Sequence, residues 1–70
     1  MTRKIRVYTY QGDTVVAEYE EGILTDEAKQ EFDKLMADAN FTVMDEQEEA
    51  PAKTFNPAHD YVAFRKMAAG

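Results

Sequence analysis

One amphipathic helical segment with β-prone segments on both sides is the feature that most limits how this chain can fold. Thr25 is suited to cap the start of the helix, and Asp26 and Glu27 follow, where carboxylates interact favourably with the helix dipole. Asn40 is expected to end the helix in a left-handed conformation. A single helix can cover only one face of a sheet. The apolar stripe that would cover it consists of Ala28, Phe32, Leu35, Met36 and Ala39.

Two β-prone runs before the helix, residues 4–9 and 14–20, are predicted to form a hairpin. We predict a three-residue loop, Gln11–Asp13, although glycine is more common at the third position of such a loop than at the second. A two-residue loop, Gly12-Asp13, would shift the register by one residue and turn the apolar side chains of one strand to the wrong face. The predicted cross-strand pairs are Thr9 with Val15, Val7 with Ala17 and Ile5 with Tyr19.

The segments after the helix are predicted to be a short strand, a long loop and a final strand. Residues 41–44 form the short strand. Residues 45–60 hold an acidic run and both prolines, and we predict an exposed, flexible loop there. Residues 61–67 form the last strand, with Val62 and Phe64 directed toward the core. The opposite face of this strand would carry Tyr61, Ala63 and Arg65.

These elements predict a single α+β domain over residues 1–70, in the order ββαββ, or ββαβ if residues 41–44 do not pair. The helix would pack on one face of a small sheet. Two topologies are consistent with this order. In a β-grasp arrangement, similar to that of ubiquitin-type proteins, the first and last strands lie parallel and adjacent at the centre of the sheet. In a simple meander, the strands follow one another and the helix packs across them.

The chain has few residues that could catalyse a reaction. It contains no serine and no cysteine, which excludes nucleophilic sites of the Ser/His and Cys/His types. Its only histidine, His59, precedes Asp60, but neighbouring side chains on a strand point to opposite faces, and no second histidine supports a metal site. A chain of 70 residues also has little room for an enclosed pocket. We therefore expect no enzyme activity, no cofactor and no metal.

The acidic run that opens the long loop is interpreted as an electrostatic surface element. Carboxylates can bind hard cations, but this run lacks the alternating ligands and the central glycine of a calcium loop. We expect its side chains to be solvated and to steer a partner by their charge, or only to keep the chain soluble. They are Asp45, Glu46, Glu48 and Glu49.

The helix-free side of the predicted sheet carries residue types that are typical of a binding surface. Tyrosine and arginine are over-represented at interaction hot spots, because they combine a large contact area with a polar group. Tyrosines also occur on exposed strands for their β-propensity alone, which is the competing interpretation. The residues predicted to contact a partner are Arg6, Tyr8, Tyr10, Val16, Tyr61 and Arg65.

The charges are distributed unevenly along a chain whose net charge is −6. Residues 13–60 hold all fourteen acidic residues, whereas the two terminal segments hold basic residues and no acid. If the terminal segments lie side by side, the molecule is electrically polarised. Such a field would steer the approach of a partner rather than determine the fold.

We predict a non-enzymatic protein-binding module: a small acidic regulator, inhibitor or adaptor that docks on a larger protein or nucleoprotein complex. Accessory proteins of phages and plasmids frequently have this size and charge. Single-stranded nucleic-acid binding through the same face ranks lower, because phosphate contacts need local positive charge. A self-assembling structural subunit is a further alternative. The chain lacks a signal-peptide core, a membrane-spanning stretch and cysteine, which favours a cytoplasmic protein without membrane contact. We expect a monomer or a weak homodimer.

Overall fold

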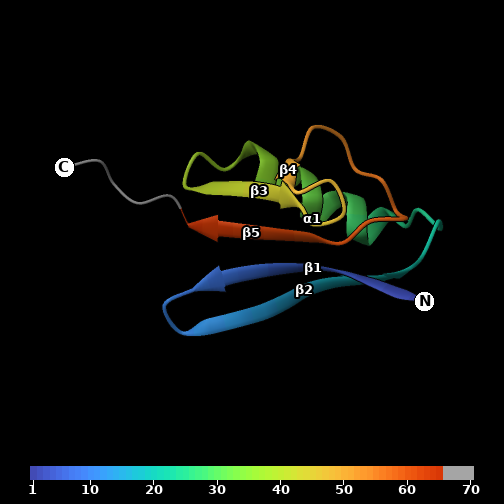
Figure 1. Ribbon diagram of the computed structural model, residues 1–70, viewed down its shortest axis with the longest axis horizontal. Helices are drawn as coiled ribbons and strands as arrows, with labels where there is room; N and C mark the ends of the chain where they lie inside the picture. Colours follow the sequence, from blue (N-terminus) through green and yellow to red (C-terminus); the bar gives the residue numbers. More distant parts are fainter. Residues whose placement is uncertain (66–70) are drawn as a thin grey trace.

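The structure, a computed structural model that describes residues 1–65, is a mixed five-stranded sheet with one helix packed against it. Its elements are β1 (Thr2–Thr9), β2 (Gly12–Glu20), α1 (Asp26–Ala37), β3 (Phe41–Asp45), β4 (Ala50–Pro51) and β5 (Tyr61–Arg65). The strands lie in the order β2-β1-β5-β3-β4 (Figure 1). The predicted α+β class is therefore confirmed, and the short strand after the helix pairs in the sheet. Within the described residues, no helix is long and apolar enough to cross a membrane.

The strands β1 and β5 lie side by side at the centre of the sheet and run parallel, although they come from opposite ends of the chain (Figure 1). Ile5 lies opposite Tyr61, and Val7 lies opposite Ala63. Parallel neighbours need a crossover connection instead of a hairpin, and α1 is part of this connection. The pairing excludes the simple meander, and it is the placement of first and last strands that the β-grasp alternative requires.

The hairpin of β1 and β2 turns at different residues from those predicted. Tyr10 and Gln11 form the turn between the paired residues Thr9 and Gly12, so both predicted loops, Gln11–Asp13 and Gly12-Asp13, are wrong. Gly12 has a φ of 111°, a backbone conformation that residues with a side chain rarely adopt. This requirement for glycine directly after the turn, rather than the alternation of side chains, sets the register beside the loop.

A β-bulge in β2 keeps the apolar side chains on the core side despite the different register. The pairing shifts by one residue between Ile5 and Arg6, and Val16 is the extra residue. Beyond the bulge, Tyr19 is buried and lies opposite Arg3 rather than Ile5. The prediction that Ile5 and Tyr19 share one face is therefore right, but their predicted pairing is wrong.

The helix α1 begins and packs as its sequence predicts, but it ends earlier. The Thr25 side chain accepts a hydrogen bond from an N–H of the first turn at 3.2 Å, which confirms the N-cap. Met36 is 41% exposed, and Ala39 lies beyond the last helical residue, so the stripe is narrower than predicted. Among the described non-glycine residues only Glu49 has a positive φ, so Asn40 does not provide the predicted left-handed end. The buried residues of α1 are Ala28, Phe32 and Leu35.

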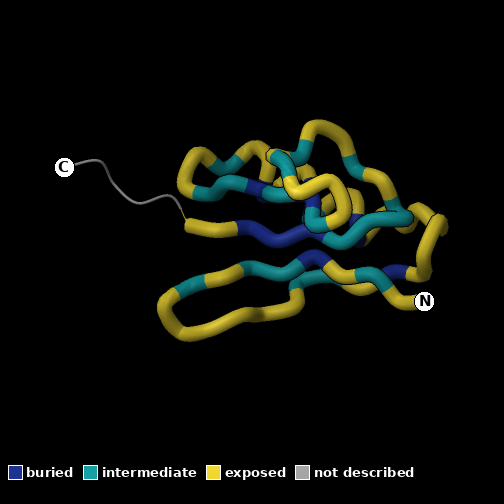
Figure 2. Tube along the Cα trace, in the orientation of Figure 1, coloured by how far each residue is buried: buried dark blue, intermediate teal, exposed yellow. Residues whose placement is uncertain are grey.

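Four aromatic rings form the centre of the core between the sheet and the helix. Phe32 of α1 packs edge-on against Tyr61 of β5, with ring centroids 4.9 Å apart. Phe55 lies against both of these rings and against Tyr19, at centroid distances of 5.3, 5.6 and 5.1 Å. The longest run of buried residues in the sheet lies on β5, as Figure 2 shows. These contacts join the helix, the hairpin, β5 and the segment that precedes β5.

Residues 45–60 are tied to the core, in contrast to the exposed loop predicted for them. They include β4, which pairs with β3, and both Ala52 and Phe55 pack against the core. The apolar residues of the segment thus help to determine its path. The following strand, β5, ends at Arg65 in the structure, and residues 66–67 of the predicted strand lie outside the described residues.

Carboxylates surround the two arginines of β1 and neutralise their charge. Arg3 forms an ion pair with Asp60 at 2.9 Å, and Arg6 pairs with Asp13 at 3.2 Å and with Glu46. The terminal segments do lie side by side as β1 and β5. However, these ion pairs remove much of the positive charge on which the predicted polarisation depends.

Asp60 holds β1 in place beside the segment that enters β5, and its replacement by Asn is expected to weaken the fold at neutral pH. Burial alone would raise the pKa of the Asp60 carboxyl, but hydrogen bonds from the Lys4 N–H, the Arg3 guanidinium and the Gln47 amide outweigh burial and lower this pKa below its ordinary value of 3.8. The stabilisation is therefore present above pH 3.8 and is lost as the pH falls through the lowered pKa. We expect Asp60→Asn to reduce the free energy of unfolding by about 1–2 kcal/mol at pH 7.

Urea unfolding of the wild type and Asp60→Asn at pH 7 and near pH 2 measures this effect. Asp33→Asn is the matched control, because Asp33 is exposed on α1 and its pair with Lys29 is worth at most a few tenths of a kcal/mol. An equal loss of stability for Asp60→Asn at both pH values would contradict a role for its charge.

Candidate functional site

The face of the sheet that α1 does not cover is formed by alternate residues of four strands. The side chains of β1 that point away from the buried Ile5 lie on it, together with their neighbours across the ladders. We call this surface the open face. Its members around the centre of the sheet are Val15, Arg6, Tyr8, Val62, Phe64, Thr42 and Met44.

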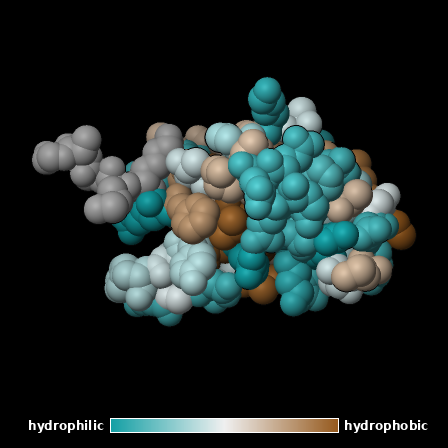
Figure 3. Space-filling model, viewed as in Figure 1, coloured by the Kyte–Doolittle hydropathy of each residue, from teal (hydrophilic) through white to brown (hydrophobic). Residues whose placement is uncertain are grey.

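Tyr8 and Phe64 form a stacked aromatic pair on the open face. They lie opposite each other across the β1–β5 ladder, with ring centroids 5.8 Å apart and an angle of 10° between the ring planes. Tyr8 remains 49% exposed and Phe64 44% exposed, whereas their neighbour Val62 is buried. Figure 3 shows a small hydrophobic area beside a strongly hydrophilic one on the face that it displays. The open face therefore presents a small, partly exposed aromatic patch next to the buried Val62.

Tyr61 and Val16 point toward the core and not to the open face, contrary to the prediction. Tyr61 is fully buried in the aromatic core, where its hydroxyl donates to the Thr54 carbonyl at 3.1 Å and accepts from the Asn56 N–H at 2.7 Å. Val16, the bulged residue, packs against the core. Because Tyr61 lies opposite Ile5 in the parallel ladder, each side chain of β5 takes the face opposite to the predicted one.

Of the other predicted contact residues, three lie on the open face or beside it, and Arg65 does not. Tyr8 and Arg6 are on it as predicted, although two carboxylates hold Arg6. Tyr10 is 90% exposed in the hairpin turn. Arg65 is exposed at the end of β5, but strand alternation places it on the side that faces the helix. Phe64, which the sequence directs toward the core, takes the place of Tyr61 in the surface patch.

The acidic run does not form the uniform solvated element that was predicted. Asp45, at the end of β3, is buried with an exposure of 8%. Glu46 is half-buried and paired with Arg6. Glu48 and Glu49 are exposed as predicted. A steering role can therefore fall only on the last two acids of the run.

The buried Asp45 organises the turn after β3 and contacts the only histidine of the chain. Its Oδ1 accepts hydrogen bonds from the N–H groups of Gln47 and Glu48, at 3.0 and 3.2 Å. Its Oδ2 lies 2.7 Å from His59 Nδ1. The His59 carbonyl accepts a hydrogen bond from the Tyr19 hydroxyl at 2.6 Å, and burial raises the pKa of this hydroxyl. The histidine is therefore anchored to the core through its backbone and to β3 through its ring.

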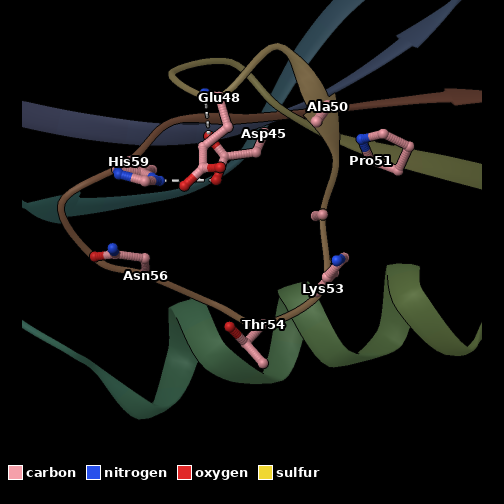
Figure 4. A pocket seen from close by; sticks show the side chains of 9 residues that line it. Asp45, Glu48, Ala50, Pro51, Lys53, Thr54, Asn56 and His59 are labelled. Atoms are coloured by element: carbon pink, nitrogen blue, oxygen red, sulfur yellow. Dashed lines mark hydrogen bonds and ion pairs between the residues drawn. The ribbon is translucent and has the colours of Figure 1, made fainter.

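A polar pocket of about 270 Å³ lies beside this contact, between the turn after β3 and the segment that leads to β5 (Figure 4). Asp45, Glu48 and His59 line it, and one donor atom from each lies within 4.8 Å of the others. Two carboxylates and an imidazole at this separation can hold a divalent cation or exchange a proton. The other lining residues are Ala50, Pro51, Ala52, Lys53, Thr54 and Asn56.

Two features of these surfaces were missed by the sequence analysis for physical reasons. Both faces of β5 are largely apolar, so alternation could not decide whether Tyr61 or Phe64 points inward. The Asp45–His59 contact joins residues fourteen positions apart, and it forms because Phe55 anchors the intervening segment in the core. No local pattern indicates either feature.

Neither a protein-family model, nor a curated protein, nor a solved structure matches this chain. Its function is therefore inferred from the geometry of the described residues.

Proposed function

We propose that this chain is a non-enzymatic protein-binding module, a small acidic regulator, inhibitor or adaptor that docks on a larger protein through its open face. The observation that carries the proposal is the exposed stacked pair of Tyr8 and Phe64. Rings that are already stacked on each other lose little conformational freedom when a partner covers them. Aromatic residues with these properties are enriched at binding hot spots.

The expected partner presents an apolar anchor with lysine or arginine residues around it. The chain carries a net charge of −6, and Arg6 at the middle of the open face is already neutralised by Asp13 and Glu46. Opposite charge on the partner would raise the association rate, while contact with the aromatic pair would slow dissociation. A cytoplasmic location is part of the proposal, because a chain without cysteine needs no oxidising compartment.

The pairing of Arg6 also places nucleic-acid binding second. A sheet face that binds single strands combines exposed aromatic rings with free cations for the phosphates. Here the rings are available, but Arg6 on the same face is held by two carboxylates. The net negative charge of the chain would also repel the phosphate backbone as the two molecules approach each other.

Self-assembly through a sheet edge ranks third, because the long edge strand is built to resist it. β2 is nine residues long and lies at one edge of the sheet. It carries exposed charged residues and the bulge at Val16, which are features that oppose edge pairing. We therefore propose a monomer or a weak homodimer. The exposed charged residues of β2 are Asp13, Glu18 and Glu20.

The double substitution of Tyr8→Ala and Phe64→Ala is expected to weaken partner binding and leave the fold cooperative. The partner is first captured from a lysate of the source cells and identified by mass spectrometry, then purified and titrated by calorimetry. Loss of two hot-spot rings should cost about 2–4 kcal/mol of binding free energy, which is roughly a 30-fold to 1000-fold rise in Kd.

Tyr10→Ala is the matched control, because it removes an exposed tyrosine from the hairpin turn and leaves the aromatic pair intact. It should change the Kd by less than about threefold, since few interface residues outside the hot spot matter. If the double variant binds the purified partner as tightly as the wild type, docking through the open face is wrong.

A further inference from the structure

We propose that Asp45, Glu48 and His59 form a binding site for one divalent metal ion of the zinc type, that is, an ion that accepts nitrogen as well as oxygen ligands. The site does not depend on the proposed docking function, because the turn after β3 and the segment before β5 build it, away from the aromatic pair. Figure 4 shows the Asp45 and Glu48 carboxylates and the His59 ring converging at one side of the pocket.

The donors lie close enough to bind one ion after a small adjustment. Their atoms are within 4.8 Å of one another, and zinc binds oxygen and nitrogen at about 2.0–2.2 Å, so ligand atoms around one ion are roughly 3–4 Å apart. His59 Nδ1 and Asp45 Oδ2 are 2.7 Å apart and need to separate only slightly to admit the ion. Glu48 is exposed, so its longer side chain is free to close the remaining distance.

The first ligand is held in place before any ion binds. The Asp45 side chain is only 11% exposed, and two backbone N–H groups of the turn hold its Oδ1. This leaves Oδ2 directed toward His59. Hydrogen bonds that orient a ligating carboxylate in this way are a regular feature of metal sites, and their loss typically lowers metal affinity about 10-fold to 100-fold.

The second ligand, His59, is also fixed by groups outside the site. Its N–H donates to the Asn56 carbonyl at 2.9 Å, and its own carbonyl accepts from the Tyr19 hydroxyl at 2.6 Å. The ring is largely buried, with a side-chain exposure of 20%. These contacts distinguish the site from a group of solvated surface acids, whose side chains are not oriented.

The charges in the pocket favour a divalent cation. Asp45 and Glu48 place two carboxylates at the site, and Lys53, the only basic residue that lines the pocket, forms no ion pair with either of them in residues 1–65. A cation with a charge of +2 would balance both carboxylates. The nitrogen donor selects the kind of cation, because calcium and magnesium take oxygen ligands almost exclusively, whereas zinc, copper, iron and nickel accept imidazole.

Three protein ligands leave at least one coordination position open toward the pocket. Structural zinc sites are closed by four protein ligands, so this set would bind an exchangeable ion with water at the open position. His59 must present an unprotonated Nδ1 to the ion, with its proton on Nε2.

The test is a calorimetric titration of the metal-free full-length chain, without a histidine tag, with zinc chloride in a buffer that does not chelate metals. We expect one ion per chain, with calcium and magnesium binding at least tenfold more weakly. His59→Ala and Glu48→Gln should each lower the zinc affinity at least about tenfold. Glu49→Gln is the matched control, since Glu49 is the exposed neighbour outside the donor group, and it should bind zinc as the wild type does.

A second measurement keeps the proposal testable if His59→Ala fails to fold. The chain has one histidine, so the imidazole signals in a nitrogen-15 spectrum of the wild type belong to His59 alone. Zinc should shift the Nδ1 resonance in a stoichiometric manner. Equal affinity for calcium and zinc, several weak sites, or an unmoved Nδ1 resonance at saturation would overturn the proposal.

Discussion

Tyr61→Ala is expected to lower the free energy of unfolding by about 3–5 kcal/mol, which is the range for truncating a large aromatic residue in a core. Tyr61 is fully buried and its ring packs against Phe32 and Phe55. Its hydroxyl also satisfies the Thr54 carbonyl and the Asn56 N–H, which would otherwise be left without these partners. A chain of 70 residues has a stability of the same order, so a large part of the variant should be unfolded.

Urea or thermal unfolding followed by circular dichroism measures this loss. Tyr61→Phe is the matched control, because it keeps the ring and removes only the hydroxyl, and we expect a loss of about 1–2 kcal/mol. If Tyr61→Ala unfolds at the same urea concentration as the wild type, its ring is not in the core. Because Tyr61 supports the fold, its loss would reduce partner binding for reasons unrelated to docking, and the test of the open face uses Phe64 instead.

Phe32→Ala is the substitution with the second largest expected effect, also about 3–5 kcal/mol. Phe32 is the residue through which α1 contacts both Tyr61 of the sheet and Phe55 of the segment before β5. Its removal leaves a cavity between three elements, and the isolated 12-residue helix is too short to be stable without packing. We therefore expect the helix and the residues around Phe55 to loosen together.

Hydrogen exchange of the backbone amides, together with urea unfolding, tests this coupling. The matched control is Met36→Ala on the same helix, because Met36 belongs to the predicted stripe but is 41% exposed. Its cost should stay below about 1 kcal/mol, as is typical of partly exposed positions. Equal losses for Phe32→Ala and Met36→Ala would show that the core is not centred on Phe32.

The helix was predicted closely because its signals are local. The Thr25 cap and the buried Ala28, Phe32 and Leu35 all depend on residues within a few positions of one another. The end of the helix was not predicted correctly. The helix stops at Ala37, and the Asp38 N–H donates to two backbone carbonyls of the last turn. The face of the helix on which a residue lies thus follows from the spacing of the apolar residues. The end of the helix depends on local hydrogen bonds that this spacing does not specify.

The hairpin illustrates a competition between two local rules. Side-chain alternation favoured a loop of Gln11–Asp13, whereas the structure places Gly12 directly after the turn with a φ of 111°. The bulge at Val16 then reconciles this register with a buried Tyr19. A bulge adds one residue to one strand, so a sequence can satisfy both the turn and the core although neither rule alone predicts the pairing.

The candidate sites were the least predictable part of the molecule. Tyr8 was placed on the open face correctly, because it alternates with the apolar Ile5 and Val7 on a single strand. Its stacking partner Phe64 and the Asp45–His59 contact lie far away in the sequence from the residues they meet.

By itself, the sequence determined the α+β class, one helix with its start and its buried face, and a hairpin before it, because periodicity and capping are properties of neighbouring residues. Only the tertiary structure decided which apolar face of β5 turns inward, where residues 45–60 run, and which polar side chains meet in the pocket. The physical reason is that these outcomes depend on burial across the parallel β1–β5 pairing and around Phe55, where the total area removed from water matters and no local pattern records it.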